Sequence, residues 1–363
     1  MQKNQLIFLS FYEKSYSRSA VLLKSESDLF ERIYYKLSSN SLAILLEFHK
    51  ILKEHKGQIG SVIVMSPSHK VVPVIRLFCR YPLILDAGWP LIDGNTSRRG
   101  PNFHWRLTSI LSYSKLKIID FLSFYLADLV LLETNAQSKR IHETFRIKKK
   151  KLKVSFTGFN EAGQFQNLDK PSERISGEEK NTQLPTRVLF RGKINYESGF
   201  SNIVEAMKLL DESFEITYVV NHIPKSHSFQ PNEIFITNFK DTDLTSIYKL
   251  ADICIGQVSS HQRLEVTIPH KAFEAAYFSK AYISAENLAI REFASAEDVF
   301  FLKKTTPEAL SEAIIKIASD QTLNRQLGSN FNKKYKQLAS QKVLGAQFDE
   351  WVLELTQTFP RGV

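Results

Sequence analysis

Residues 253–276 read ICIGQVSSHQRLEVTIPHKAFEAA, and this segment contains the pattern from which the fold class can be predicted. The apolar run Ile253–Ile255 predicts a short buried strand, and a polar loop follows it. Pro269 suits the first position of a helix, because its missing N–H is not needed there, and the alanines after it favour helix. A strand, a loop and a helix in this order form the repeating unit of α/β proteins.

The same alternation extends along the chain in both directions from this unit. Apolar runs of strand length occur at residues 6–9, 61–65, 83–86, 129–132, 188–190, 214–220, 234–236 and 281–284. Apolar residues at helical spacing occur at residues 17–23, 42–53, 71–79, 110–126, 136–145, 200–210, 244–250, 307–319 and, with breaks, about 322–358. Strands that alternate with helices predict doubly wound, Rossmann-like and mainly parallel sheets.

The chain has 363 residues, which suits two domains of roughly 150–200 residues each. Between Glu161 and Pro185 the composition shifts to polar and charged turn formers, which predicts a linker. We expect an N-terminal Rossmann-like domain at 1–165, a linker at 166–186, a second Rossmann-like domain at 187–340 and a C-terminal helix at 341–363 that packs back toward the first domain. Ligands of such sheets bind beyond the carboxyl ends of the strands, so two facing domains predict a site in the cleft between them.

The composition is that of a soluble globular protein, with 43% hydrophobic and 24% charged residues. No stretch approaches the roughly 20 apolar residues that span a bilayer, and the apolar run near the N-terminus is too short for a signal peptide. Cys79 and Cys254 lie far apart without metal-ligand spacing, which favours buried thiols in a reducing compartment. The sequence therefore predicts a cytoplasmic protein.

A formal net charge of +10 points to anionic partners. The densest basic run, Arg146–Lys153, is interpreted either as a solvated turn before a strand or as a contact with an anionic membrane surface, at the inner face of the plasma membrane. The helix at 110–126, with Arg106, Lys115 and Lys117 near it, is a second candidate for that contact, although we expect its apolar face to be core. Nucleic acid is not expected, because no aromatic platform, zinc pattern or recognition helix accompanies the charge.

The helix that follows Pro269 has the features of a nucleotide site. Its first turn presents free N–H groups and a partial positive charge, which suit a phosphate, and Lys271 adds a full charge. Glu274, one turn on, can accept two hydrogen bonds from a vicinal diol such as the ribose hydroxyls. The competing interpretation is an exposed salt bridge between Lys271 and Glu274 at i,i+3 spacing.

A second strand and turn support the nucleotide interpretation. Residues 188–199 read VLFRGKINYESG and precede a helical segment. Gly192 lets the backbone approach a ligand, and Lys193 can reach a diphosphate from the carboxyl end of the strand.

From about Arg187 to Asp320 the chain resembles the nucleotide-binding domain of GT-B glycosyltransferases, in particular the retaining family 4. Phe190–Gly199 resembles that family's G-R-L…E-K-G turn, Leu244–Cys254 is similar to L…LY-x-x-A-D, and Ile268–Ala276 resembles P-x-K-x-x-E. Ala127–Leu132 and Val154–Asn160 resemble the end of its N-terminal domain. The five motifs stand in the family's order.

The resemblance implies roles for single residues. Glu274 would hold the donor ribose, and Lys193 stands where the family has its diphosphate-binding arginine. The loop from Ser259 and Ser260 to Thr267 would cover the diphosphate and the sugar, and Asn238 and Phe239 would contact the base through their backbone.

Two positions depart from the family pattern. Ser198 replaces the second diphosphate cation, a charge that Lys271 or Arg263 can supply. Glu265 is one place away from the position of the family's second glutamate, and it is our candidate for contact with the sugar at the reacting carbon.

The N-terminal half contributes acceptor-side candidates. Asp86 ends a strand and precedes a turn into the predicted cleft, so it is a candidate catalytic carboxylate, and the alternative is that it caps the turn. Asp93, His104 and Arg18 are further acceptor-side candidates. Asp241-Thr-Asp243 resembles a metal-binding D-x-D motif but precedes a helix, so we interpret it as a helix cap and expect no metal.

These observations favour a metal-independent glycosyltransferase of the GT-B fold, a hexosyltransferase with no bound cofactor. Its donor would be a UDP- or GDP-sugar, and its acceptor a glycan or a lipid-linked glycan in surface polysaccharide or glycolipid synthesis. Retention of configuration is implied by the family alone. The alternatives are an inactive scaffold of the same fold and a sugar-nucleotide epimerase.

Overall fold

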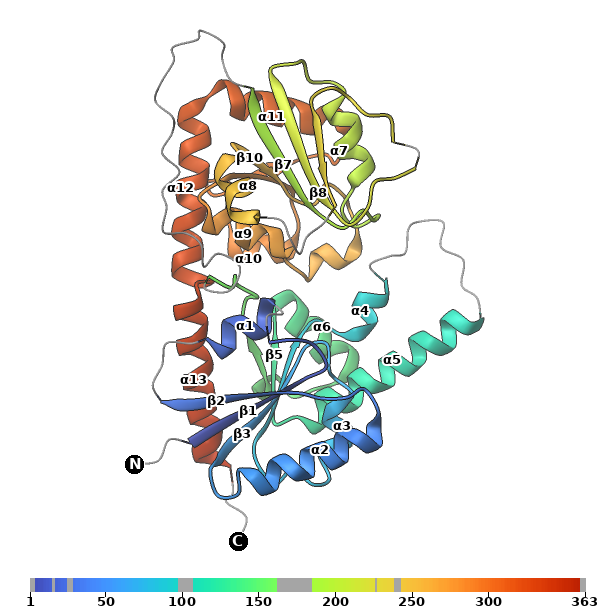
Figure 1. Cartoon of the computed structure of the whole chain (residues 1–363), viewed down its shortest axis with the longest axis vertical. Coiled ribbons are helices and arrows are strands. Elements are labelled where there is room, and N and C mark those ends of the chain that lie inside the picture. Colours follow the sequence, from blue (N-terminus) through green and yellow to red (C-terminus); the bar gives the residue numbers. More distant parts are fainter. Residues whose placement is uncertain are drawn as a thin grey trace. The chain divides into compact units, whose positions relative to one another are not determined.

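The computed structural model of the chain describes residues 4–14, 17–24, 29–96, 107–161, 185–225, 227–237 and 243–359. The chain forms two compact units (Figure 1). Unit 1 comprises Met1–Asn160, Glu265–Ile268 and Leu338–Val363, and unit 2 comprises Glu161–Leu264 and Pro269–Gln337.

Unit 1 is built on a parallel six-stranded sheet in the order β2-β1-β3-β4-β5-β6. Its strands are β1 (Asn4–Ser10), β2 (Phe30–Lys36), β3 (Ile59–Met65), β4 (Leu83–Gly88), β5 (Leu129–Leu132) and β6 (Leu152–Val154). Its helices are α1 (Ser17–Leu23), α2 (Ser41–Glu54), α3 (Val71–Ile75), α4 (Leu91–Thr96), α5 (Leu107–Leu126), α6 (Asn135–Phe145) and α13 (Gln341–Thr358), with a 3₁₀ turn at Lys149–Lys151.

Both faces of this sheet are covered, as the near-continuous apolar runs of its strands require. On one face α2, α3, α5 and α6 bury side chains such as Phe48, Ile75 and Phe124. On the other face Phe348 and Val352 of α13 and Leu22 of α1 pack on β1 and its neighbours.

Unit 2 repeats the plan, with strand order β12-β11-β10-β7-β8-β9 and all pairs parallel. The strands are β7 (Thr186–Gly192), β8 (Phe214–Val220), β9 (Glu233–Ile236), β10 (Ile253–Ile255), β11 (Ala281–Ala285) and β12 (Phe300–Leu302). The helices are α7 (Phe200–Met207), α8 (Leu244–Leu250), α9 (His270–Tyr277), α10 (Leu288–Phe293), α11 (Pro307–Ser319) and α12 (Gln321–Leu338).

The predicted fold class, two doubly wound Rossmann-like domains, is confirmed. Several boundaries differ from the sequence prediction. α3 ends at Ile75 rather than at residue 79, which leaves Leu77 and Phe78 outside it and exposed. Pro269 is the N-cap of α9 and not its first residue, because its ψ of 132° is extended. The elements β2, α4, α10 and β12 were not predicted.

The prediction that the apolar face of α5 is core is wrong for most of the helix. Its inner side buries Asp120, Ser123 and Phe124, whereas many of its large apolar side chains are exposed. The helix packs against the sheet through its last turns only, and its first turns extend beyond the sheet (Figure 1).

Within the described ranges, no helix is long and apolar enough to cross a membrane.

Candidate functional site

The sheet of unit 2 has a topological switch point between β7 and β10. From β7 the chain runs outward through β8 and β9, then returns to place β10 on the other side of β7. The carboxyl ends of the two strands therefore open a crevice, the usual place for a ligand in such sheets. Arg191 and Gly192 end β7, and Gly256 and Gln257 follow β10.

Helix α9 brings Lys271 and Glu274 to this switch point. Both side chains are buried. The interpretation of the pair as an exposed salt bridge is therefore wrong. The ion-pair partner of Glu274 is Arg191, which is half-buried.

The carboxylate of Glu274 is saturated by donors of the chain itself. Arg191 Nη1 donates to both oxygens, at 2.6 Å to Oε2. The Tyr248 hydroxyl donates to Oε2 at 2.6 Å, and His270 Nδ1 lies 3.0 Å from Oε1. Burial by itself would raise the pKa of Glu274, but the charge of Arg191 and the bonds from His270 and Tyr248 outweigh it and hold the pKa below its ordinary value. Glu274 is thus a buried, permanent anion.

Lys271 is a buried cation beneath the turn that Gly192 begins. Its Nζ lies 4.0 Å from the ring centroid of Phe190 and 3.2 Å from Gln257 Oε1. A Cβ at Gly192 would come within 2.8 Å of this Nζ, so a larger residue there would displace the ammonium group. Burial and, to a smaller extent, the neighbouring Arg191 lower the pKa of Lys271 to about 7, against the opposing effect of Glu274.

The turn between Gly192 and α7 is locked to the loop after β10. Gly199, the N-cap of α7, has a left-handed φ of 67°, and a Cβ there would collide with the Val258 carbonyl. Val258 N donates to Ser198 O at 3.1 Å, and Ser259 Oγ donates to Glu197 O at 2.6 Å. These contacts hold the turn and the loop after β10 together at the switch point.

Of the two residues proposed to replace the cation missing at Ser198, the structure brings Lys271 to the switch point. Ser198 itself is a turn former, since its N–H bonds to Asn195 Oδ1 at 2.9 Å. Arg263 is paired with the buried Glu197 at 2.6 Å. Its charge is therefore already matched within unit 2.

Most of the remaining donor-side candidates are more exposed to solvent than Lys271 and Glu274. Lys193, Ser260 and Glu265 are exposed, and Ser259 is buried. Asn238 and Phe239 lie outside the described residues, as does Asp241. Asp243 accepts from Thr245 N at 3.0 Å and Ser246 N at 3.3 Å, which confirms it as the N-cap of α8.

Unit 1 has its own switch point, between β1 and β3. The side chains at this switch point differ from those in unit 2, because serine hydroxyl groups take the place of charged groups. Ser10 Oγ lies 3.4 Å from Ser68 Oγ, which also accepts from Phe11 N at 2.9 Å. Ser66 lies beside Gly88, at the end of β4.

Arg18 and Asp86, both acceptor-side candidates, form one buried ion pair next to these hydroxyls. Arg18 Nε donates to Asp86 Oδ1 at 2.5 Å, and Nη1 donates to Ser155 O at 2.9 Å. The carboxylate of Asp86 thus serves Arg18 rather than capping the turn after β4. Burial raises the pKa of Asp86, and Arg18 only partly offsets this. Asp86 Oδ2 and Arg18 Nη2 have no partner among the described residues.

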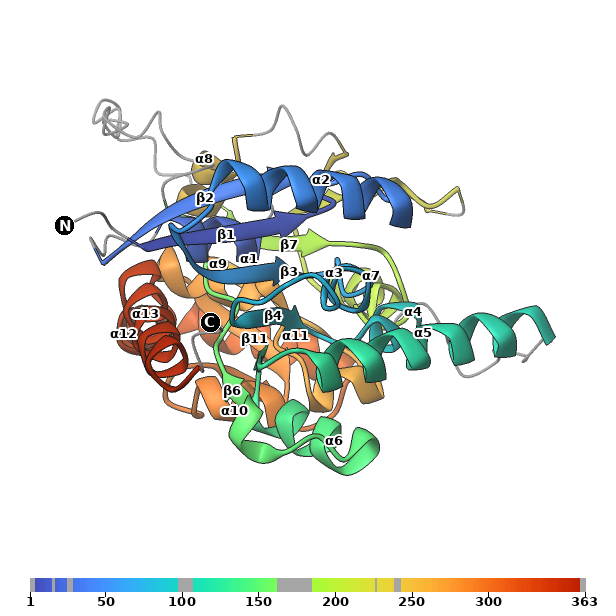
Figure 2. The same cartoon turned by 90° about the horizontal axis from the view of Figure 1, so that it is seen from below.

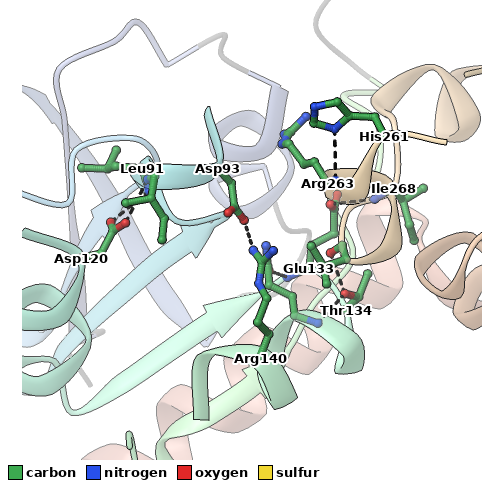
Figure 3. Close-up of polar contacts among 12 residues, drawn as sticks. Leu91, Asp93, Asp120, Glu133, Thr134, Arg140, His261, Arg263 and Ile268 are labelled. Carbon is green, nitrogen blue, oxygen red and sulfur yellow. Dashed lines mark hydrogen bonds and ion pairs between the residues drawn. The ribbon is translucent and has the colours of Figure 1, made fainter. Parts of the chain in front are cut away.

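Asp93 lies apart from this pair, in α4. It forms an ion pair with Arg140 of α6 (Figure 3). Nearby, Asp120 accepts from Leu91 N at 3.0 Å and Ile92 N at 3.1 Å, and burial raises the pKa of Asp120 to about 7. His104 lies outside the described residues.

Sequence reasoning missed Glu133, which follows β5. Its carboxylate accepts from Thr157 Oγ1 and, at 3.0 Å, from Ile268 N (Figure 3). Thr134 Oγ1 donates to Val266 O at 2.8 Å, so Glu133 and Thr134 together anchor the segment Glu265–Ile268 in unit 1. The next residue, Pro269, is the N-cap of α9. The sequence did contain a signal for Glu133, because an acidic residue directly after a strand lies at the carboxyl end of the sheet, where ligands bind.

No group of three or more His, Cys, Asp or Glu side chains suited to a metal ion occurs in the part of the chain that the structure describes.

No protein-family model matches the chain, and no curated protein matches it. Solved structures do. Sucrose-phosphate synthase from Thermosynechococcus elongatus superposes with a TM-score of 0.70 at 13% identity, over 98% of this chain and 100% of that one. HepE from Anabaena in complex with UDP-glucose gives 0.65 at 13% identity, over 96% and 99%.

A third similar structure is UDP-GlcNAc 2-epimerase from Neisseria meningitidis bound to UDP-GlcNAc. It gives a TM-score of 0.57 at 10% identity, over 96% of this chain and 100% of that one. The chain therefore has the GT-B fold, and likeness at this level of identity establishes the fold alone.

Proposed function

We propose that the protein is a glycosyltransferase that uses a nucleotide-diphosphate sugar, and that the donor binds at the switch point of unit 2. One observation carries the proposal: two cations, Arg191 and Lys271, and one anion, Glu274, are gathered where β7, β10 and α9 meet. Charges are costly to bury unless they are compensated. Here positive charge exceeds negative charge, and a diphosphate would complete the balance.

Lys271 and the backbone around Gly192 are the proposed diphosphate contacts. The ammonium group lies beneath the turn, and the free N–H groups at the start of α9 add partial positive charge. Lys193, exposed at the start of the same turn, is a second cation for the outer phosphate. The diphosphate is the leaving group of a glycosyl transfer, so these groups stabilise the charge that develops on it.

Glu274 remains the proposed acceptor for the ribose hydroxyls. A carboxylate offers about four acceptor positions, and donors of the chain engage all of them in this structure. Ribose binding therefore requires one donor to move aside. His270 is the candidate, since its side chain is partly exposed whereas that of Tyr248 is buried.

Unit 1 is the proposed acceptor unit. Asp86, with its unpartnered Oδ2, is the proposed catalytic carboxylate on that side, and Glu265 is proposed to contact the transferred sugar. Asp93 and Arg18 shape the acceptor side through their ion pairs. We propose a UDP- or GDP-hexose as donor and a glycan or lipid-linked glycan as acceptor, in polysaccharide or glycolipid synthesis. The hexose is supported by UDP-glucose in the HepE complex.

A sugar-nucleotide epimerase is the second candidate, because a UDP-GlcNAc 2-epimerase shares the fold. Both reactions need the same donor site and differ in what happens to the sugar.

The test is incubation with a panel of UDP- and GDP-sugars, with and without oligosaccharide and lipid-linked acceptors. A transferase releases free nucleoside diphosphate and elongates an acceptor, an epimerase returns an altered sugar nucleotide, and a scaffold does neither. Glu274→Gln should reduce turnover, whereas the matched change Glu312→Gln, at an exposed position of α11, should not. Binding of the panel without any turnover would refute the transferase.

A further inference from the structure

One face of unit 1 exposes an unusual number of large apolar side chains. They lie on α2, just after α3 and on α5, on the helix layer that covers one side of the sheet (Figure 2). The most exposed are Leu42 (67%), Leu77 (86%) and Leu111 (63%). Other members of this set, which we call the apolar face, are Leu46, Phe78, Ile110, Ile118, Phe121, Leu122 and Tyr125.

On α5 the exposed residues form a stripe and not a scatter. Leu111, Ile118, Leu122 and Tyr125 are spaced by seven, four and three, so they share one side of the helix. The opposite side carries the buried Asp120, which is also the only acid of α5. One side of α5 thus turns four large apolar side chains toward water, with the exposed Lys115 among them.

The exposed apolar side chains lie on neighbouring elements. α3 packs against both α2 and α5, and the exposed Leu77 and Phe78 follow its last residue. Single exposed apolar residues are common on soluble proteins, but a set gathered on three adjacent elements is typical of an interaction surface.

Basic side chains border this apolar face. On α2 the exposed stripe of Leu42 and Leu46 continues into Lys50 and Lys53. On α5, Lys115 and Lys117 are exposed between the apolar positions.

The basic run after α6 lies against the far end of α5. Lys151 Nζ donates to Tyr125 O at 2.8 Å and Ala127 O at 2.7 Å. The exposed Lys148, Lys149 and Lys150 therefore stand beside the apolar stripe, although they are remote from it in sequence. Two exposed acids, Glu54 and Glu143, occur on the same helix layer, so the net charge of the layer is positive.

We propose that this face docks on an anionic lipid bilayer, with the apolar stripe of α5 and Leu77–Phe78 entering the headgroup boundary and the lysines contacting anionic headgroups. Charge complementarity decides for a bilayer, since apolar side chains bordered by lysines match the apolar interior and negative surface of such a membrane. The inference does not rest on the proposed enzymatic function, because it uses none of the residues of the switch points.

The test is flotation of the full chain with vesicles of phosphatidylcholine alone and of phosphatidylcholine with phosphatidylserine. Binding is expected to the anionic vesicles and to weaken steeply as salt is raised. Ile118→Ser with Leu122→Ser should lower binding by about tenfold or more. The control is Leu288→Ser, at an exposed position of unit 2, which should leave binding unchanged.

Charge is tested separately. Lys149→Gln with Lys150→Gln should lower binding to anionic vesicles by about fivefold for each lysine lost. The control pair Lys303→Gln with Lys304→Gln, exposed in unit 2, should leave it unchanged. All changed residues are exposed, and thermal unfolding confirms that each variant is folded.

Three results would overturn the proposal. They are absence of binding to both kinds of vesicle, equal binding to both, and self-association without lipid that Ile118→Ser with Leu122→Ser abolishes. The last result would assign the face to a second copy of the chain. Hydrolysis of a soluble donor by these variants reports on the enzymatic proposal independently.

Discussion

At the switch point of unit 2 the buried Lys271 and Glu274 lie with the half-buried Arg191, whereas unit 1 has hydroxyl groups and a single buried ion pair there. The strands are arranged alike around these points. From β1 the chain adds β2 on one side and then crosses to β3 on the other, and from β7 it adds β8 and β9 on one side and then crosses to β10. Topology therefore opens both crevices, and side-chain chemistry decides what each can bind. The cationic crevice suits a diphosphate, and the hydroxyl-lined one suits a neutral polar group such as a sugar.

The ion pairs in the two units also differ in how they hold their charge. Arg191, Tyr248 and His270 all stabilise the ionised form of Glu274. For Asp86, Arg18 alone favours the ionised form, and complete burial outweighs it, so the pKa of Asp86 is raised. A buried charge with several donors is preorganised for a charged ligand, while one with a single partner can take up a proton instead.

The largest expected effect comes from removing one cation from each pair. Arg191→Met leaves the buried Glu274 without its ion-pair partner and should lower the free energy of unfolding by about 3 kcal/mol at neutral pH. Arg18→Met should cost less, because Asp86 can become protonated. Urea unfolding measures both.

The pH dependence of this comparison follows from the sign of the shift. The pKa of Glu274 is depressed in the folded chain, so its ion pair stabilises the parent above the unfolded pKa of about 4.5 and loses this effect as pH falls through the folded pKa. The cost of Arg191→Met should therefore shrink in acid. An equal or larger cost for Arg18→Met at neutral pH would contradict the contrast between the two pairs.

The next effect is on the donor. Glu274→Gln removes a charge-assisted hydrogen bond worth about 1.5–3 kcal/mol, so affinity for the sugar nucleotide should fall by roughly ten- to a hundredfold. Asp86→Asn, the matching change at the other switch point, should leave donor affinity unchanged. Calorimetry of both variants checks this.

A 2′,3′-dideoxy analogue of the nucleotide sharpens the same prediction. It lacks the diol, so it should bind the parent and Glu274→Gln with similar affinity. If the analogue loses as much affinity as the full donor when Glu274 is changed, the carboxylate acts through Arg191 and not on the ribose.

A smaller effect is the pH dependence of donor binding through Lys271. With its pKa at about 7, the ammonium group is largely charged at pH 6 and largely neutral at pH 8.5. A bound diphosphate favours the charged form, so affinity should be constant below pH 6 and fall by about tenfold between pH 7 and 8.5. A sugar nucleotide is the probe, because its diphosphate does not titrate in this range.

Lys271→Met should remove this pH dependence and weaken the sugar nucleotide more than the bare nucleoside, which carries no phosphate. A slope that persists in the variant would place the titrating group elsewhere.

No effect is expected from chelation. The diphosphate is proposed to be neutralised by Lys271 and helix N–H groups, so addition of EDTA should leave donor affinity and turnover unchanged. A strict requirement for Mg²⁺ or Mn²⁺ that Asp241→Ala abolishes would show that the D-x-D segment binds metal.

Most of the fold was predictable because buried parallel strands leave continuous apolar runs, as at Ser61–Met65 and Leu129–Leu132. β2 was not predicted from the sequence, because it lies at the edge of its sheet and its residues, FERIYYK, are mostly half-buried and include charged side chains. α10 and β12 are too short for periodicity to show. Register and strand order depended on the three-dimensional structure.

The candidate site was predictable in part. Lys271 and Glu274 stood out because a proline and a strand–loop–helix pattern placed them at a helix start. Arg191 did not, since a basic residue at a strand end is usually solvated, and only the fold shows that it meets Glu274, 83 positions later. Glu133 was hidden for the same reason, because its partner Ile268 lies 135 positions away.

Donor binding at the switch point of unit 2 can be measured by calorimetric titration of UDP- and GDP-sugars into the parent, into Lys271→Met with Glu274→Gln, and into Asp86→Asn. We expect a sugar nucleotide to bind the parent and Asp86→Asn with equal affinity. The double variant, shown to be folded by its thermal unfolding transition, should bind it at least about a hundredfold more weakly. Equal binding by the double variant and the parent would contradict the assignment of the donor to the switch point of unit 2.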